Sequence, residues 1–423
     1  MTWLITLGML ALILSGTPLY ALIGAAALLA FHSAEIDGSA VFIELYRLTS
    51  APTLMAIPLF TLAGFMMAES KTPQRLTRLS KAFLGGLPGG LPLVVLMACA
   101  FFTAFTGASG VTIIALGGLL YPLLMREHYG KDFSLGLITA SGSVGLLFPP
   151  SLPLILYGII AQVQIDQLFI AGIVPGILRI LIFAVFGMFI GYRLKISTIP
   201  FDKKVAWAAI KEARWEIPLP FLILTCIYGG FITVPEAAGV TVVYVLIVET
   251  WIYGDLGLKK DLPRIIINSM VLVGSILIIL GTAMGFTSYL VDEQIPMQVL
   301  DWMKVFIDDR LTFLIVLNLF LLAVGCMMDI FSAIMVVVPL IVPIAQHFEV
   351  NMVHLGIIFL TNLEIGYMTP PVGLNLFLAS SRFQEPILRL YRASLPFLAL
   401  MLFGLVLITY FPALSLALLD WFS

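Results

Sequence analysis

Charged residues are scarce in this sequence: they make up 11% of the 423 amino acids, whereas hydrophobic residues make up 61%. Soluble globular chains carry about 25% charged residues. With a mean hydropathy of +1.10, the chain has too little polar surface to cover a globule in water. Lipid must therefore surround most of it. The net charge of −2 argues against a nucleic-acid partner.

Reactive and metal-binding patterns are also lacking. The three cysteines, Cys99, Cys226 and Cys326, lie in apolar stretches without CxxC or Cys/His spacing, so we expect small buried hydrophobic side chains. The sequence has no HExxH motif and no deep pair of aspartates, which argues against an intramembrane enzyme. The N-terminus lacks the positive region of a cleavable signal peptide, so we expect its first apolar segment to stay in the membrane.

Long apolar segments dominate what is present, and they predict an all-α polytopic membrane protein with about ten transmembrane helices. A spanning backbone must satisfy its hydrogen bonds internally, which favours helices, and no segment alternates like a transmembrane β-strand. We expect apolar helical segments at residues 3–16, 18–31, 53–68, 91–125, 133–161, 169–191, 217–233, 237–252, 265–290, 311–345, 354–379 and 395–419.

Basic residues in the connecting segments mark the cytoplasmic side of the membrane. They cluster at 69–82, 193–215, 253–264 and 380–392, which we place inside. The mainly acidic segments 32–52 and 291–309 are placed outside, and both chain termini are predicted to be periplasmic.

Segment 91–125 does not fit a single crossing. Three apolar segments separate the two inside segments 69–82 and 193–215, so one of the three must cross an even number of times. Segment 91–125 is uncharged and has Thr-Gly-Ala-Ser-Gly at its middle (106–110), which predicts a re-entrant hairpin from the cytoplasm. The same count predicts a hairpin from outside over 311–345, with its tip near 326–332. A tight pair of full spans is the alternative, but legs of ~17 residues are short for that.

The spacing of prolines repeats between the two halves of the chain. Pro122 and Pro149 are 27 positions apart, as are Pro343 and Pro370, at an offset of 221 positions. Because one hairpin is expected to enter from each side, the repeats are inverted. Inverted repeats with broken helices are typical of secondary transporters that bind solute near the membrane midplane.

The repeat divides the chain into a first repeat (1–192), a cytoplasmic linker (193–216) and a second repeat (217–423). In the first repeat we expect scaffold helices over 3–68, the hairpin 91–125, a broken helix over 133–161 and a helix at 169–191. The second repeat is expected to follow the same order, with elements at 217–290, 311–345, 354–379 and 395–419.

Consecutive prolines break the two helices at Pro149-Pro150 and Pro370-Pro371, because each removes an amide donor and clashes with the preceding turn. The freed carbonyls, with hydroxyls on the hairpin tips, are hard oxygen ligands for a small cation. Unpaired amides at the helix N-termini of the tips suit an anionic solute such as a carboxylate. The plainer alternative is that the prolines only kink the helices and that Thr106-Gly107 only allows close packing.

Four motifs resemble the large membrane subunit of tripartite ATP-independent periplasmic (TRAP) transporters. They are Ile-Pro-Leu-Phe-Thr-Leu-Ala-Gly (57–64), Thr-Gly-Ala-Ser-Gly-Val-Thr (106–112), Gly-Leu-Leu-Phe-Pro-Pro-Ser (145–151) and Asn-Leu-Glu-Ile-Gly-Tyr-Met-Thr-Pro-Pro-Val-Gly-Leu-Asn (362–375). The resemblance implies sodium-coupled uptake of an organic acid, such as a dicarboxylate, sugar acid or sialic acid, by an elevator mechanism. It also implies a bacterial inner-membrane location, a small membrane subunit and a periplasmic substrate-binding protein as partners. A standalone carrier or ion antiporter of the same design is the alternative.

The resemblance also implies two sodium sites, both carried over by position. The first would use Thr103, Thr106, Gly145, Phe148 and Pro150. The second would use Gly325, Gly366, Thr369 and Val372. The residues predicted to act in substrate binding or coupling are Ser109, Asp329, Ser332 and Asn375.

Other polar residues in apolar segments carry weaker expectations. Asp329 is the only charged side chain in the second hairpin, so it is functional by default or caps a helix. Glu364 is expected to hydrogen-bond and hold the second break open, and Glu249 to be an ordinary interfacial residue beside Trp251. We expect no arginine deep enough in the membrane to select a carboxylate.

Under an elevator mechanism, we expect a scaffold and a moving transport body. The scaffold would comprise residues 3–31, 53–68, 217–252 and 265–290. The transport body would comprise both hairpins, both broken helices, 169–191 and 395–419. Segments 69–82 and 193–215 would lie amphipathically at the cytoplasmic surface and link the two bodies.

Overall fold

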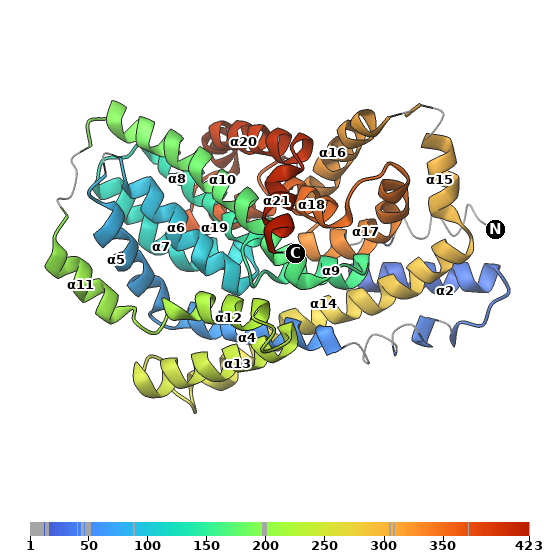
Figure 1. The fold of residues 1–423 in the computed structure, drawn as a ribbon, viewed down its shortest axis with the longest axis horizontal. Helices are drawn as coiled ribbons and strands as arrows, with labels where there is room; N and C mark the ends of the chain where they lie inside the picture. Colours follow the sequence, from blue (N-terminus) through green and yellow to red (C-terminus); the bar gives the residue numbers. More distant parts are fainter. Residues whose placement is uncertain are drawn as a thin grey trace.

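The computed structural model describes residues 12, 17–39, 41–43, 46, 52–87, 89–196, 201–303, 306–307, 309–370 and 372–422, and every regular element in these ranges is a helix (Figure 1). Within these described ranges, eight helices are long and apolar enough to cross a membrane, or up to nine if a bent pair counts as one span. The chain is therefore an all-α polytopic membrane protein. The predicted segment 3–16 lies outside the described residues.

One group of helices packs along the lower edge of Figure 1. Helix α4 packs on α13 and α14, and α14 also packs on α2. Helix α13 begins at a capping box in which Thr233 and Glu236 satisfy each other's end groups. These are the predicted scaffold segments, with bounds α2 Leu19–Ser33, α4 Ala56–Glu69, α12 Pro218–Tyr228, α13 Val234–Ile247 and α14 Asp261–Asp292.

Each predicted hairpin is a pair of helices joined by a short turn. The first pair, α6 (Leu91–Thr106) and α7 (Ser109–Arg126), turns at Gly107, whose φ of 63° is the left-handed conformation that favours glycine. The second pair, α16 (Arg310–Met327) and α17 (Ile330–His347), turns at Met328 and Asp329. The two tips therefore lie where the sequence predicts them, and their sidedness stays a prediction.

Both predicted breaks are present. The first lies between α8 (Lys131–Ser141) and α9 (Leu152–Ala161), with a single 3-10 turn between them and a bend of 45° across the break. The second separates α18 (Met352–Gly366) from α19 (Leu374–Phe383). Helix α18 ends at Gly366, whose carbonyl can receive no amide from Pro370, whereas α8 already ends at Ser141, eight residues before Pro149.

The predicted single helix over 395–419 is wrong. The structure has α20 (Ile387–Tyr410) and α21 (Ala413–Phe422), separated at Phe411 and Pro412. Proline at 412 cannot donate to the preceding turn. Helix α20 also begins well before residue 395, at Ile387 directly after Pro386, and its Arg389 pairs with Asp132.

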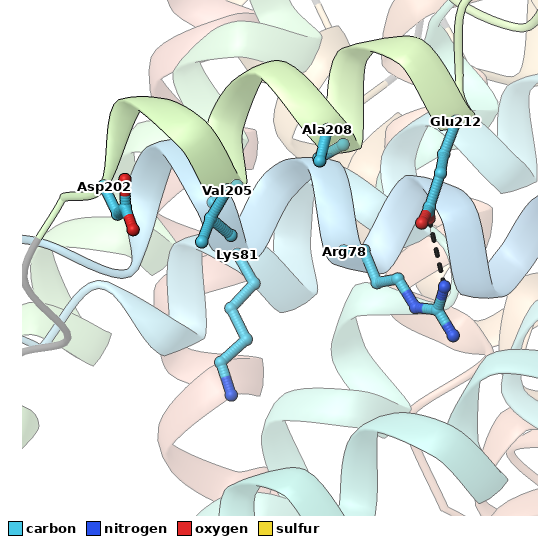
Figure 2. Close-up of a pocket in the computed structure, with 8 residues that line it drawn as sticks. Arg78, Lys81, Asp202, Val205, Ala208 and Glu212 are labelled. Atoms are coloured by element: carbon cyan, nitrogen blue, oxygen red, sulfur yellow. Dashed lines mark hydrogen bonds and ion pairs between the residues drawn. The ribbon is translucent and has the colours of Figure 1, made fainter.

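Two shorter helices connect the scaffold group to the rest. Helix α5 (Thr72–Leu84) packs against α11 (Lys203–Glu212), as Figure 2 shows. Arg78 and Glu212 form an exposed ion pair of 3.0 Å between them. The buried face of α5 and its basic outer face agree with the amphipathic surface helix expected at 69–82. The long helix α10 (Ile165–Arg193) and the short α15 (Ile295–Met303) complete the elements discussed below.

Arg75 fastens α5 to the scaffold group. Its guanidinium lies 2.6 Å from Asp255 and 3.0 Å from Glu249, and it also pairs with Glu216. The ring of Tyr253 stacks 3.8 Å from the same guanidinium. Glu249, expected to be an ordinary interfacial residue, is instead buried at 1% exposure.

The charges in this cluster support one another. Burial alone would raise the pKa of Asp255, but hydrogen bonds from the Arg75 side chain and the Lys71 amide outweigh it and lower that pKa. Burial opposes the charge of Arg75, but Asp255, Glu216 and Glu249 raise its pKa above the ordinary value. Helix α5 is thus held by charged groups at the ends of α12 and α13.

Candidate functional site

The first break packs directly against the first hairpin. The hydroxyl of Thr103 lies 2.7 Å from that of Thr112 and donates to the Gly142 carbonyl at 2.9 Å. A Cβ at Gly145 would lie 2.6 Å from the Thr103 Cβ and would also collide with the Ala100 carbonyl. Only glycine allows this approach, so two predicted ligands, Thr103 and Gly145, are brought together.

Thr106 differs from Thr103 and Thr112 in that its hydroxyl has no hydrogen-bond partner among the described residues. It is the last residue of α6 and is fully buried. A buried hydroxyl without a partner costs free energy unless a ligand or water satisfies it. Phe148 and Pro150 follow at the break, and Phe148 packs its ring against Gly176 of α10.

The second break is held even more tightly against its hairpin. Gly325 of α16 and Gly366 at the end of α18 touch through their backbones, and a Cβ on Gly366 would collide with Gly325. Thr369 donates to the Ile365 carbonyl at 2.8 Å, so its hydroxyl proton is used within the break. Val372 is exposed at 43%. Gly325, Gly366 and Thr369 therefore gather at one place, and Val372 faces outward.

Asp329 caps the second hairpin tip, which is one of the two roles expected for it from the sequence. Asp329 accepts hydrogen bonds of 3.0 Å from the amides of Phe331 and Ser332, and the Ser332 hydroxyl donates to the same carboxylate. The Ile330 amide donates to the Tyr367 hydroxyl at 2.6 Å. The expectation of unpaired amides at both tips is wrong for this tip. Tyr367 lies inside the quoted motif 362–375, but a tyrosine near a break gives no sign of which amide it reaches.

The first tip reaches across to the second repeat. The Ser109 hydroxyl at the start of α7 donates to Asn375 Oδ1 at 2.7 Å, and Asn375 lies at the start of α19. Asn375 is fully buried, and its Nδ2 has no partner among the described residues. Two residues predicted for the substrate, Ser109 and Asn375, thus meet although 266 positions separate them.

A buried arginine lies close to the second break, and the sequence reading missed it. Arg179 of α10 forms an ion pair with Glu364 of α18, and their side chains are 2% and 0% exposed. Because Glu364 pairs with Arg179, the expectation that no arginine selects a carboxylate by itself stays a prediction. Glu364, the partner of Arg179, lies two residues before Gly366, where α18 ends. A charged residue within an apolar segment was the available signal, because such residues are rare and pair internally.

The resemblance in the sequence motifs extends over nearly the whole chain. The family model described as "Tripartite ATP-independent periplasmic transporter, DctM component" matches residues 6–414. The C4-dicarboxylate TRAP transporter large permease protein DctM of Pseudomonas aeruginosa is 35% identical over 399 residues, covering 94% of this chain and 93% of that protein. The sialic acid TRAP transporter large permease protein SiaM of Vibrio cholerae is 31% identical over 373 residues, covering 88% and 87%.

A solved structure shares the fold. The YdaH transporter of Alcanivorax borkumensis superimposes with a TM-score of 0.56, covering 87% of this chain and 86% of that one, at 12% identity. At 12% identity, this structural similarity is evidence for the arrangement of the helices alone.

Proposed function

The chain belongs to the DctM family of large TRAP-transporter permeases, and from that premise we propose that it imports a small organic anion together with sodium. The observation that carries the proposal is the pairing of each broken helix with a hairpin, with the buried Thr106 hydroxyl left unpartnered at the first tip. Hydroxyl and carbonyl oxygens are the ligands that a hard monovalent cation requires, and broken helices supply them in secondary transporters.

Two clusters of oxygens would hold the ions. Around the first break, Thr103, Thr106 and the carbonyls of Gly145, Phe148 and Pro150 are the candidate ligands. Around the second, the candidates are Gly325, Gly366, Thr369 and Val372. The contact of Gly325 with Gly366 supports the second cluster, because it brings hairpin and break carbonyls within one small volume.

The solute class is a carboxylate. Two of the relatives are named for C4-dicarboxylate and sialic acid transport, and both of these solutes carry a carboxylate group. In this proposal sodium orders the hairpin tips and so raises the affinity for the anion, which couples the two.

Movement would follow an elevator mechanism. The scaffold of α2, α4, α12, α13 and α14 stays fixed, while both hairpins, both broken helices, α10, α20 and α21 move as one body. Helices α5 and α11 link the two bodies, and the attachment of Arg75 to the scaffold group supports this division. A small membrane subunit and a periplasmic substrate-binding protein complete the system, in a bacterial inner membrane.

The test is uptake into proteoliposomes that contain the permease with its small subunit, supplied with the binding protein outside. Radiolabelled succinate and N-acetylneuraminate are the probes, with and without an inward sodium gradient. Thr106→Val keeps the side-chain shape without the hydroxyl and should abolish sodium dependence. The matched control is Thr241→Val on α13, where the buried hydroxyl only donates to the Ala237 carbonyl.

Three outcomes contradict parts of the proposal. Normal sodium-dependent uptake by both Thr106→Val and Asp329→Ala would reject the site assignment. Uptake that ignores the sodium gradient in the wild type would reject the coupling ion. Full uptake without the binding protein would favour a standalone carrier.

A further inference from the structure

Helix α10 packs against both broken helices. One face of it carries Gly172, Gly176 and Arg179, whose spacings of four and three positions place them on the same side of the helix. The two glycines contact the first break, and Arg179 pairs with Glu364 near the end of α18. Seven residues of α-helix span about 10 Å, so this face joins the two breaks over a short distance.

The contact of α10 with the first break leaves no free space. A Cβ at Gly172 would collide with the Leu147 carbonyl, and a Cβ at Gly176 would lie 2.7 Å from the ring of Phe148. Phe148 is also a candidate ligand of the first sodium ion through its carbonyl. Because closely packed groups transmit displacements, a shift of the Phe148 backbone on ion binding should move α10 as well.

The contact of α10 with the second break is made by a buried ion pair. Among the described residues, the charged groups of Arg179 and Glu364 have no hydrogen-bond partner apart from each other. Each charge must therefore follow the position of the other, because an unpaired charge in the interior is costly. Glu364 lies two residues before Gly366, whose backbone touches Gly325 of the second hairpin. These two glycines are candidate ligands of the second sodium ion.

We propose that α10 couples the two sodium sites, and that the Arg179–Glu364 pair positions the second break relative to the first. This inference rests on the proposed sodium-coupled uptake and deepens it, because it concerns how the two ions bind. An ion at the first break raises the affinity of the second break for sodium, and by linkage the reverse effect has the same size. Arg179 and Glu364 are positioning residues, since neither is a candidate ligand of an ion.

The experiment titrates the purified permease, with its small subunit and without solute, with sodium chloride. N-methyl-D-glucamine chloride keeps the ionic strength constant. Sodium that binds only the folded protein stabilises it against thermal unfolding, which gives the half-saturating concentration and the Hill coefficient of binding. At high sodium the stabilisation rises with the logarithm of the concentration in proportion to the number of bound ions. The wild type should bind two ions with a Hill coefficient clearly above one.

Replacing both charges tests the pair without leaving a lone charge in the interior. The double variant Arg179→Met with Glu364→Met should fold and should still bind two ions at high sodium. Its Hill coefficient should fall to about one, and its half-saturating sodium concentration should rise about fivefold or more, because the help from the other ion is lost. A role in stability alone would leave the Hill coefficient unchanged.

A second variant tests the contact of α10 with the first break and keeps both charges. Gly176→Ala places a methyl group against the Phe148 ring and should lower the Hill coefficient. The matched control is Gly187→Ala on the same helix, where a Cβ would collide with Pro92 of α6. Both alanine variants should unfold at a lower temperature without sodium, but the control should keep the Hill coefficient of the wild type.

The outcomes separate this inference from the proposed function. An unchanged Hill coefficient in the double variant overturns the role of the pair, and leaves the direct packing of α18 on the turn of the first break as the connection. Binding of a single ion by the double variant also overturns it, because the pair would then form the second site. If the double variant does not fold, equal Hill coefficients in the two alanine variants overturn the coupling through α10.

The wild type decides the rest. A Hill coefficient of one with two bound ions overturns the coupling, while sodium-coupled uptake still stands. If sodium does not change the unfolding temperature of the wild type at all, both the coupling and the proposed coupling ion are wrong.

Discussion

The guanidinium of Arg179 is paired with the carboxylate of Glu364 in the interior of the helix bundle, where neither side chain is more than 2% exposed. The pair joins α10 of the first repeat to α18 of the second. Glu364 lies two residues before Gly366, which touches Gly325 of α16, so the pair and this contact lie close together at the end of α18. Two charges removed from water are costly, so the pair is stable only while both partners are present.

Removing one partner should therefore harm the protein more than removing both. Arg179→Met leaves a buried carboxylate without its cation, and breaking a buried pair in this way costs about 3–5 kcal/mol. The double variant Arg179→Met with Glu364→Met should recover most of the lost thermal stability, measured by unfolding of the purified permease in detergent. A double variant less stable than Arg179→Met would contradict this account.

The backbone design could be predicted from the sequence because its signals are local. Consecutive prolines end helices wherever they occur, and glycine at 107 permits a left-handed turn. The first tip and both breaks lie at such residues, whereas the second tip turns at Met328 and Asp329 and was expected there from the count of crossings. The division of 395–419 was missed because the lone Pro412, close to the chain end, was treated as part of an apolar run.

The polar contacts could not be predicted in the same way. Arg75 hydrogen-bonds to Glu249, 174 positions away, and Ser109 hydrogen-bonds to Asn375, 266 positions away. The local sequence around each residue does not indicate its partner. Arg75 lies in a segment whose basic residues indicate the cytoplasmic side, and that pattern gives no sign that its guanidinium is buried. At the second tip, the cap by Asp329 is local, but the hydrogen bond from the Ile330 amide to the Tyr367 hydroxyl is set by tertiary packing.

Gly64 should be intolerant of any side chain. It ends the motif 57–64 on α4, and a Cβ there would lie 2.5 Å from the Phe105 carbonyl and 2.8 Å from the Thr106 Cα. Overpacking of this kind costs about 1–3 kcal/mol, so Gly64→Ala should displace the first tip and lower sodium-dependent uptake at least several-fold. The control is Gly274→Ala on α14, where a Cβ would meet nothing within 4 Å. Equal uptake by the two variants would show that the tip does not need this contact.

Arg75→Gln should loosen α5 from the scaffold group. The change leaves Glu216, Glu249 and Asp255 near one another without their shared cation, at a cost of about 3–5 kcal/mol. Hydrogen exchange of the α5 amides should accelerate strongly. The control is Arg78→Gln one turn away, since the Arg78–Glu212 pair of Figure 2 is 67% and 45% exposed and such pairs contribute about 0–1 kcal/mol. Similar exchange in both variants would place the attachment of α5 elsewhere.

The attachment of α5 should also withstand alkaline pH. Tyr253 stacks on Arg75 and donates to Glu216 at 2.8 Å, and burial together with the nearby Glu216 charge raises the pKa of its phenol. The pKa of Arg75 is raised as well.

A group whose pKa is raised in the folded state contributes stability that is complete below the group's ordinary pKa and declines only above that pKa. For a tyrosine that value is about 10, so protection of the α5 amides, corrected for intrinsic exchange, should be constant from pH 7 to about 10. The measurement is the tyrosinate absorbance of the wild type minus that of Tyr253→Phe. This difference should stay near zero for roughly another pH unit above 10. A rise near pH 10 would show that Tyr253 is not held in this cluster.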